Sequence, residues 1–424
     1  MWKNALWFAA GSLVGGLVVF GWGLRMETAP PARKHAALEG SLERLADAVR
    51  DAGQFVRGHL WYGSEREQAE AHRHVVRALV SALESKALTD PDFPDFAELD
   101  PRSKGGMDNP DQRYLGASLR GDAVYRVFGD RGSSRRLDFT LYGEDELSKS
   151  ISTLTTDALV VDDDGGFEVF IGGAPREHNW LASRPGTVRL LVRQIHSDWS
   201  TETPGSIHID RVDGERPTYP PFSPAIMAER LDDATTTFAR NVRRWPEFSR
   251  TRLHALLPEN ALTPPRDTGT EGGLSGRLMV GGHYELADDE ALWITTWPSD
   301  AAYQGIQLGH HWWESLDYAN RQVSLTADQA HRSSDGAFHF VVSARDPGVA
   351  NWLDTEGFRR GVVMLRYDGL GLDALPEDEH PVARRVPLDA LWSLLPADEP
   401  RLGPEERAAA VAERRRHVQA RFRH

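Results

Sequence analysis

The sequence predicts an α+β fold in which an N-terminal transmembrane helix and a helical hairpin precede two related antiparallel β-sandwich units, with a helical insert between them. Three observations predict this fold. Residues 5–24 are uncharged and mostly apolar. The segment that follows has the 3.6-residue apolar period of amphipathic helices. Two later stretches alternate between apolar and polar residues, as strands with one buried face do, and they share a sequence pattern.

The apolar run at residues 5–24 predicts a single transmembrane anchor. Twenty residues at about 1.5 Å per residue span about 30 Å, which is the thickness of a bilayer's hydrocarbon core. A cleavable signal peptide is the alternative, but Arg25, Met26 and Glu27 follow the run where small residues would precede a cleavage site. We therefore expect a membrane protein of the single-pass type.

The flanks of this segment bear on its orientation and its partners. Arg25, Arg33 and Lys34 lie on its C-terminal side, and the positive-inside rule would place that side in the cytoplasm. Short-tailed bacterial anchors often export the domain that follows them, however, and we expect an extracytoplasmic soluble domain. Gly11 and Gly15 form a G-x-x-x-G pair, a spacing that allows two helices to pack as a homodimer.

Further elements follow in order along the chain. A helical hairpin is predicted at residues 37–88, and Ser64 with Glu67 forms a capping box for its second helix. The first β unit is predicted at residues 108–215. A helical insert with Ser223 as N-cap occupies residues 223–257. The second β unit is predicted at residues 277–390, and a polar C-terminal helix at residues 403–422.

Apolar alternation and turn residues predict strands within each unit. In the first unit they are expected at residues 123–128, 137–142, 166–171 and 188–194. In the second unit they are expected at residues 277–280, 291–297, 305–308, 337–343 and 361–367.

The two β units share an internal repeat. Residues 164–167 (Asp-Gly-Gly-Phe) correspond to residues 335–338 (Asp-Gly-Ala-Phe), and residues 179–181 and 351–353 are both Asn-Trp-Leu. Arg193 and Arg366 each end an apolar strand. Features present in both units are expected to be framework: the Asn side chains would bond a turn, the Trp rings would pack between the sheets, and the Arg side chains would pair with carboxylates.

Composition excludes several classes of function. The chain has 424 residues and a formal net charge of −14, which disfavours binding to the phosphates of nucleic acids. It has no Cys, so disulfides, thiolate nucleophiles and Cys-ligated zinc are excluded. A lack of Cys also fits an oxidising compartment. No phosphate-binding loop or H-E-x-x-H zinc motif is present, and we predict no cofactor and no metal.

The richest candidate for a functional site lies in residues 307–321, which have no counterpart in the first unit. We predict His310, His311 and Asp317 as catalytic residues, because neutral His is suited to proton transfer near pH 7. Adjacent side chains on a strand face opposite ways, so both His side chains would not bind one metal without a bulge. Buried packing of these His residues is the alternative, as is an ordinary i,i+4 pair of Asp317 with Arg321.

The predicted ligand-binding residues are aromatic and charged side chains from two parts of the chain: Trp313, Tyr318, Arg321, Arg193 and Asp198. The last two belong to a polar and aromatic cluster that follows the first unit and could face the second. The thirteen Trp residues favour binding or processing of a small apolar or aromatic molecule. The alternative is a non-catalytic carbohydrate-binding or scaffold module with a glycan ligand. Whether the protein is an enzyme is left open.

Several motifs resemble a bacterial family known as domain of unknown function 1214. They are Asp-Asn-Pro-Asp-x-x-Tyr at residues 108–114, the Asn-Trp-Leu elements, and Trp-Glu-Ser-Leu-Asp-Tyr-Ala-Asn-Arg-Gln-x-Ser-Leu at residues 313–325. The resemblance covers most of residues 37–422. It implies a jelly-roll-like β domain and supplies no established catalytic residues.

Overall fold

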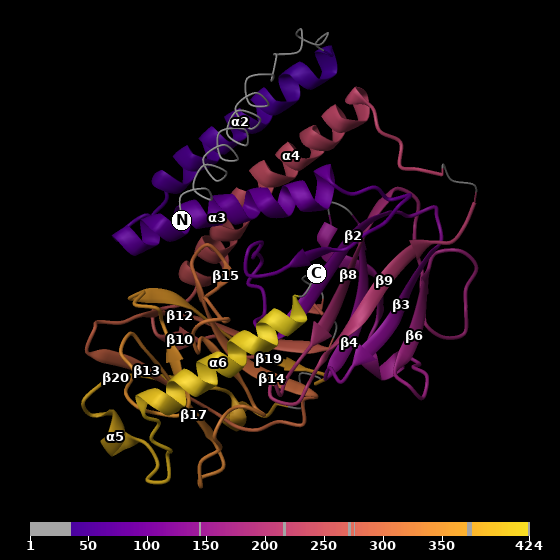
Figure 1. The fold of residues 1–424 in the computed structure, drawn as a ribbon. Coiled ribbons are helices and arrows are strands. Elements are labelled where there is room, and N and C mark those ends of the chain that lie inside the picture. The colour runs from indigo at the N-terminus through magenta and orange to yellow at the C-terminus, as the bar shows by residue number, and fades with distance from the viewer. Residues whose placement is uncertain are drawn as a thin grey trace, which may run out of the picture.

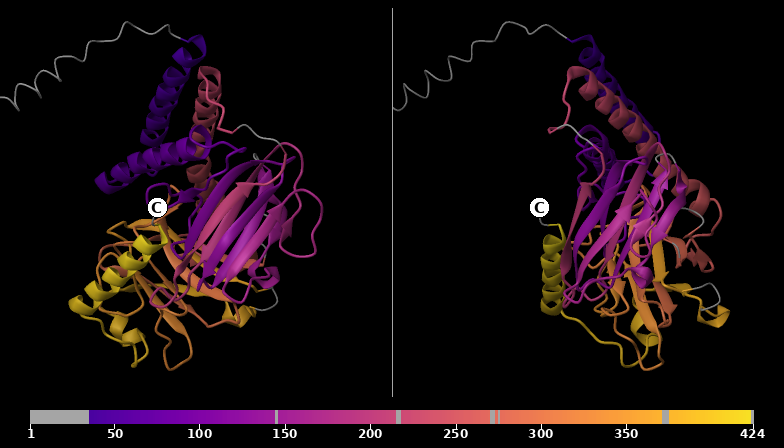
Figure 2. Two further views of the ribbon diagram at one scale, coloured as in Figure 1. Left: turned by 45° about the vertical axis from the view of Figure 1, so that its right-hand side comes forward. Right: turned by 90° about the vertical axis from the view of Figure 1, so that its right-hand side faces the viewer.

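A helical layer and two β-sandwich units make up the described part of the chain (Figure 1). The computed structural model describes residues 35–143, 146–214, 218–269, 273–274, 276–370 and 375–422. Helix α6 (Pro404–Arg421) lies against the second unit, and its C-terminal end reaches the first unit, where Arg421 Nη1 donates to the carbonyl of Pro110 at 2.6 Å (Figure 2).

The helical layer contains α2 (Ala36–Arg57), α3 (Glu65–Ala82) and α4 (Pro224–Ser249). Ser64 and Glu67 form the predicted capping box, and Ser223 Oγ accepts from the N–H of Ile226 at 3.3 Å as the predicted N-cap. Helix α2 lies alongside α4 while α3 crosses beside them, and one apolar cluster joins all three helices (Figure 1).

The first unit consists of two sheets with the strand orders β1-β2-β8-β4-β5 and β7-β6-β3-β9. Leu115 on β2 and Phe139 on β4 alternate with outward-facing positions, as Val127 on β3 and Val169 on β6 do on the opposite sheet, and these inward side chains share one core. The strands are β1 (Ala97–Leu99), β2 (Gln112–Arg120), β3 (Tyr125–Gly132), β4 (Arg136–Gly143), β5 (Glu146–Leu154), β6 (Gly166–Ile171), β7 (Trp180–Leu181), β8 (Thr187–Ile195) and β9 (Pro204–Arg211).

The second unit repeats this arrangement. Its sheets have the orders β10-β12-β19-β14-β15 and β18-β17-β13-β20, with β11 beside β12 and β16 beside β14. The order β12-β19-β14 corresponds to β2-β8-β4, and β18-β17-β13-β20 corresponds to β7-β6-β3-β9. The elements are β10 (Ala261–Leu262), β11 (Arg266–Asp267), β12 (Arg277–Glu285), β13 (Glu290–Thr296), β14 (Tyr303–His310), β15 (Glu314–Ser315), β16 (Ser324–Thr326), β17 (Phe338–Ser343), β18 (Trp352–Asp354), β19 (Arg360–Asp368), β20 (Val382–Pro387) and α5 (Leu391–Leu394).

The repeated Asn residues make matching contacts, as the internal repeat predicts. Asn179 accepts from the N–H of Val160 at 2.9 Å and donates to its carbonyl at 2.7 Å. Asn351 makes the same two bonds with His331, both at 2.8 Å. Each Asn therefore holds a loop against the parallel strand pair of its unit.

The other framework expectations need correction. Leu181 and Leu353, not the Trp residues beside them, belong to the cores between the sheets, since neighbouring strand residues face opposite ways. Arg193 donates to the hydroxyl groups of Thr140 and Tyr142, at 3.1 and 3.0 Å, and to no carboxylate of the described residues. Arg366 donates to the side-chain oxygen of Gln307 and to the carbonyl of Met107.

Replacing Asn351 with alanine tests the framework role of the repeat. Asn351 is 1% exposed, so the change leaves the two backbone groups of half-buried His331 without these partners. We expect a loss of about 1–3 kcal/mol in the free energy of unfolding, measured by urea denaturation. Asn320→Ala, at an exposed position, is the control. Equal small effects of the two changes would contradict the framework role.

The predicted fold class and localisation are corrected in two respects. Among the residues that the structure describes, no helix is both long and apolar enough to cross a membrane, so a single-pass membrane protein is not supported. Residues 5–24, on which that prediction rested, lie outside the described residues. The sheets are also mixed, not purely antiparallel, because β6 pairs in parallel with β7 and β17 with β18.

Candidate functional site

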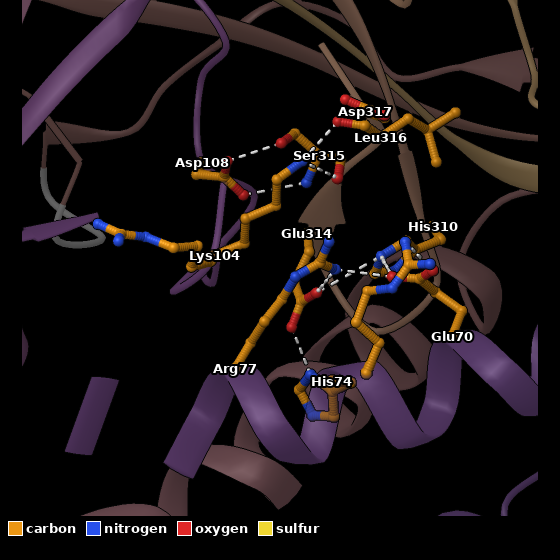
Figure 3. Close-up of polar contacts among 12 residues, drawn as sticks. Glu70, His74, Arg77, Lys104, Asp108, His310, Glu314, Ser315, Leu316 and Asp317 are labelled. Carbon is orange, nitrogen blue, oxygen red and sulfur yellow. Dashed lines mark hydrogen bonds and ion pairs between the residues drawn. The ribbon is translucent and has the colours of Figure 1, made fainter. Parts of the chain in front are cut away.

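His310 and Glu314 belong to a buried ionic cluster between α3 and the second β unit (Figure 3). Glu70, His74 and Arg77 lie on one face of α3, and His310 pairs with Glu314 across β14 and β15. Arg77 Nη1 donates to Glu70 Oε1 at 2.7 Å and to Glu314 Oε2 at 2.8 Å. This guanidinium therefore bridges the two carboxylates and ties the helical layer to the sheet.

His74 is the second residue of α3 that contacts Glu314. Its Nδ1 lies 2.6 Å from Glu314 Oε1, and its Nε2 lies 3.0 Å from the carbonyl oxygen of Val242. His74 therefore links the Glu314 carboxylate to the backbone of α4. Burial alone would raise the pKa of Glu314, but His74 and Arg77 lower it to about 2. Arg73 Nη1 also lies 3.0 Å from Glu70 Oε2, so the two carboxylates have two guanidinium partners from their own chain.

Glu70, His310 and Glu314 also place potential metal ligands close together, with one atom from each within 4.8 Å of the others. His310 Nε2 lies 3.1 Å from Glu70 Oε1 and 3.5 Å from Glu314 Oε2. Oxygen and imidazole ligands suit several divalent metals. Arg77 already contacts both carboxylates, however, and a metal would have to displace it. The contacts favour a structural ionic cluster over a metal centre.

The remaining predicted catalytic residues point elsewhere. His311 Nδ1 lies 2.9 Å from His254 Nε2, and burial lowers the pKa of His311 well below its ordinary value. The carboxylate of Asp317 accepts from the amide of Asn320 and is turned away from His310 (Figure 3). The three predicted catalytic residues therefore do not converge.

The predicted ligand-binding residues are also dispersed. Trp313 packs in an apolar cluster, and the ring centre of Tyr318 lies 4.5 Å from the ammonium group of Lys104. Arg321 pairs with Asp354 at 2.7 Å, in place of the expected Asp317. Arg193 is held by hydroxyl groups, as described above. Asp198 accepts from two hydroxyl groups within its own turn, those of Ser200 and Thr201.

A cavity of about 80 Å³ lies between the helical layer and the first β unit, and we call it the arginine pocket. Arg189 reaches it from β8, where its neighbours Val188 and Leu190 belong to the core. Arg240 and Arg244 reach it from successive turns of α4. Its other lining residues are mostly small or polar: Ser81, Glu84, Ser85, Lys86, Thr89, Ala97, Glu98, Leu99, Gly116, Ala117, Ser118, Val188, Thr237 and Asn241.

The arginine pocket concentrates positive charge in an acidic protein. Burial lowers the pKa of Arg189. The phenol group of Tyr142 opposes this shift, and the neighbouring charges of Arg193, Arg240 and Arg244 add to it. Burial and the charge of Arg240 lower the pKa of Arg244 in the same way. Within the described ranges, neither Arg189 nor Arg244 has a carboxylate partner. Such uncompensated charges cost stability unless an anion binds them.

Sequence reasoning missed this pocket. Arg240 and Arg244 are four residues apart on one helix, where like charges repel, and this spacing was an available signal. Arg189 gave no signal, because an outward-facing Arg on a strand is ordinary. The pocket forms only when α4 packs beside the first β unit.

Two solved bacterial structures resemble the chain to different degrees. An uncharacterized protein from Burkholderia cenocepacia is 30% identical, with a TM-score of 0.76 over 84% of this chain and 99% of that one. A protein from Vibrio parahaemolyticus is 13% identical, with a TM-score of 0.43 over 81% of this chain and 100% of that one. No family model and no curated protein matches. The chain belongs to the same family as the Burkholderia protein.

Proposed function

We propose that the protein binds a small anionic molecule in the arginine pocket. The observation that carries this proposal is the approach of Arg189 and Arg244 to one cavity without carboxylate partners in the described part of the chain. Guanidinium groups bind carboxylates and phosphates through paired, charge-assisted hydrogen bonds. An anion would also relieve the repulsion between the neighbouring Arg side chains.

The residues that line the arginine pocket can be compared with the small apolar or aromatic ligand that the sequence suggests. No aromatic side chain lines the pocket within the described residues, so the pocket gives no support to an apolar or aromatic ligand. We keep membership of the domain of unknown function 1214 family, with a jelly-roll-like topology, as a proposal that rests on the quoted motifs and the repeated strand order.

Titration calorimetry with inorganic phosphate tests the proposal. We expect binding of one phosphate, and we expect Arg189→Met to weaken it about tenfold to a hundredfold, since a charged hydrogen bond contributes roughly 1.5–3 kcal/mol. Without phosphate the same variant should melt no lower than the unchanged protein, because an uncompensated charge is removed. Arg359→Met, which removes an exposed partner of Asp288, is the control. Equal phosphate affinity of Arg189→Met and the unchanged protein would contradict the proposal.

A further inference from the structure

We infer that the ligand of the arginine pocket carries two linked anionic groups, as a diphosphate does. This inference rests on the proposed function and starts from the charge around the pocket. Arg193 lies four residues after Arg189 on β8, so the two side chains share one face of the sheet. Arg193 donates to hydroxyl groups and, like Arg189 and Arg244, has no carboxylate partner in the described part of the chain. A single phosphate group carries about −1.5 to −2 charges and would leave part of this positive charge uncompensated.

Acidic side chains near the pocket do not offset this charge. The carboxylates among its described lining residues are Glu84 and Glu98. The register of β1 with β2 places Glu98 opposite Leu115, and its carboxylate pairs with Arg113 on the core face of the sheet. Arg189 lies on the opposite face of the same sheet. Glu84 alone therefore remains to offset three arginine side chains.

Tyr142 indicates how strong the positive potential is. It lies opposite Arg189 in the register of β4 with β8, and its hydroxyl group accepts from Arg193 Nη2 at 3.0 Å. Burial alone would raise the pKa of Tyr142, but contacts with Arg193 and Thr140 and the charge of Arg189 lower it below its ordinary value. Negative charge is therefore favoured here even against the cost of burial.

Arg240 gives the second anionic group its place. It lies four residues before Arg244 on α4, so the Cβ atoms of the two residues are about 5–6 Å apart on one helix face. The charge of Arg240 lowers the pKa of both Arg189 and Arg244, so it lies near both. Arg240 is exposed, whereas Arg189 and Arg244 are partly buried. The first group accordingly lies between Arg189 and Arg244, and the second lies toward solvent, beside Arg240.

The guanidinium group of Arg240 is suited to this role whatever else it contacts. It has five N–H donors, so it can bind an anionic group and keep a contact within the protein. Its paired donors match the oxygen atoms of a phosphate group.

Inorganic phosphate and pyrophosphate are the matched ligands for a test, since pyrophosphate consists of two linked phosphate groups. In calorimetry without divalent metal ions, we expect the unchanged protein to bind pyrophosphate about tenfold more tightly, a ratio that corresponds to about 1.4 kcal/mol. Arg240→Met should weaken pyrophosphate binding about tenfold and phosphate binding no more than about threefold, because only pyrophosphate reaches Arg240.

A control must separate a second binding position from general charge, because pyrophosphate carries more charge than phosphate. Arg243→Met provides it. Arg243 is exposed on α4, next to Arg244, and it does not line the pocket. Its loss removes the same charge from the same helix, and we expect it to change both affinities less than about twofold. Circular dichroism checks the fold of both variants.

The outcomes separate the two proposals. Equal affinity for phosphate and pyrophosphate would overturn the inference of two anionic groups and leave anion binding standing. Equal weakening of both ligands by Arg240→Met would overturn it as well, and so would an Arg243→Met variant that loses as much pyrophosphate affinity as Arg240→Met. If neither phosphate nor pyrophosphate bound, the proposed function itself would be wrong.

Discussion

Replacing Glu314 with alanine is expected to lower the free energy of unfolding by about 3–5 kcal/mol, the usual cost of breaking a buried ion pair. Glu314 is 1% exposed and contacts both His74 and Arg77. Its loss removes the carboxylate partner of His74 and one of the two carboxylates that Arg77 contacts. Chemical denaturation measures the effect, and Glu314→Gln separates the loss of charge from the loss of volume.

An exposed ion pair gives the matched control for this change. Asp288 and Arg359 are each 66% exposed, and pairs of this kind contribute about 0–1 kcal/mol. Asp288→Ala should therefore change stability little. If Glu314→Ala were no more costly than Asp288→Ala, the ionic cluster would not be what joins α3 to the second unit.

Acid is expected to destabilise the protein from about pH 6.5 downward, through buried histidines. Burial lowers the pKa of His417 to about 3 and of His254 to about 4, and it lowers those of His196 and His311 as well. These groups accept protons more readily in the unfolded chain. The contribution of these neutral histidines to the free energy of unfolding is therefore complete above pH 6.5. It is lost as the pH falls toward their pKa values in the folded state, at about 1.4 kcal/mol per pH unit for each His.

His196→Leu isolates one of these groups. His196 is fully buried, and neither ring nitrogen has a hydrogen-bond partner among the described residues. At about pH 7.5 the variant should be at least as stable as the unchanged protein. Between about pH 6 and 5, the slope of its free energy of unfolding against pH should be smaller than that of the unchanged protein by about 1.4 kcal/mol per pH unit. Burial raises the pKa of the Asp111 carboxyl group, so this group stabilises the folded protein as the pH falls. Its contribution cancels when His196→Leu is compared with the unchanged protein. Exposed His178→Gln is the control. Parallel pH profiles for His196→Leu and the unchanged protein would contradict this account.

Local signals in the sequence predicted local structure well. The capping box at Ser64 and the N-cap at Ser223 appear as expected, because each depends on residues within one turn. The matched bonds of Asn179 and Asn351 show that the repeat also carried information about loops. Strands β2 and β9 were missed, because each has only a few apolar positions between small and charged residues.

The site depended on contacts that no local pattern reveals. His310 was chosen for its residue type and its neighbours in the sequence, but its partner Glu70 lies 240 residues away on α3. Arg189 and Arg244 come from a strand and a helix that meet only through the packing of the helical layer. Residue type favoured residues 307–321 as a functional site, whereas the burial of His310, His311 and Trp313 indicates a structural role for this segment.

Anomalous diffraction from crystals soaked in selenate tests the central claim most directly. Selenate is a tetrahedral dianion like phosphate, and its selenium atom can be located without assumptions about the ligand. Anion binding in the arginine pocket predicts a selenium peak between Arg189 and Arg244 in the unchanged protein, and none there in Arg189→Met. Selenium peaks elsewhere on the molecule with none in this pocket would contradict the claim.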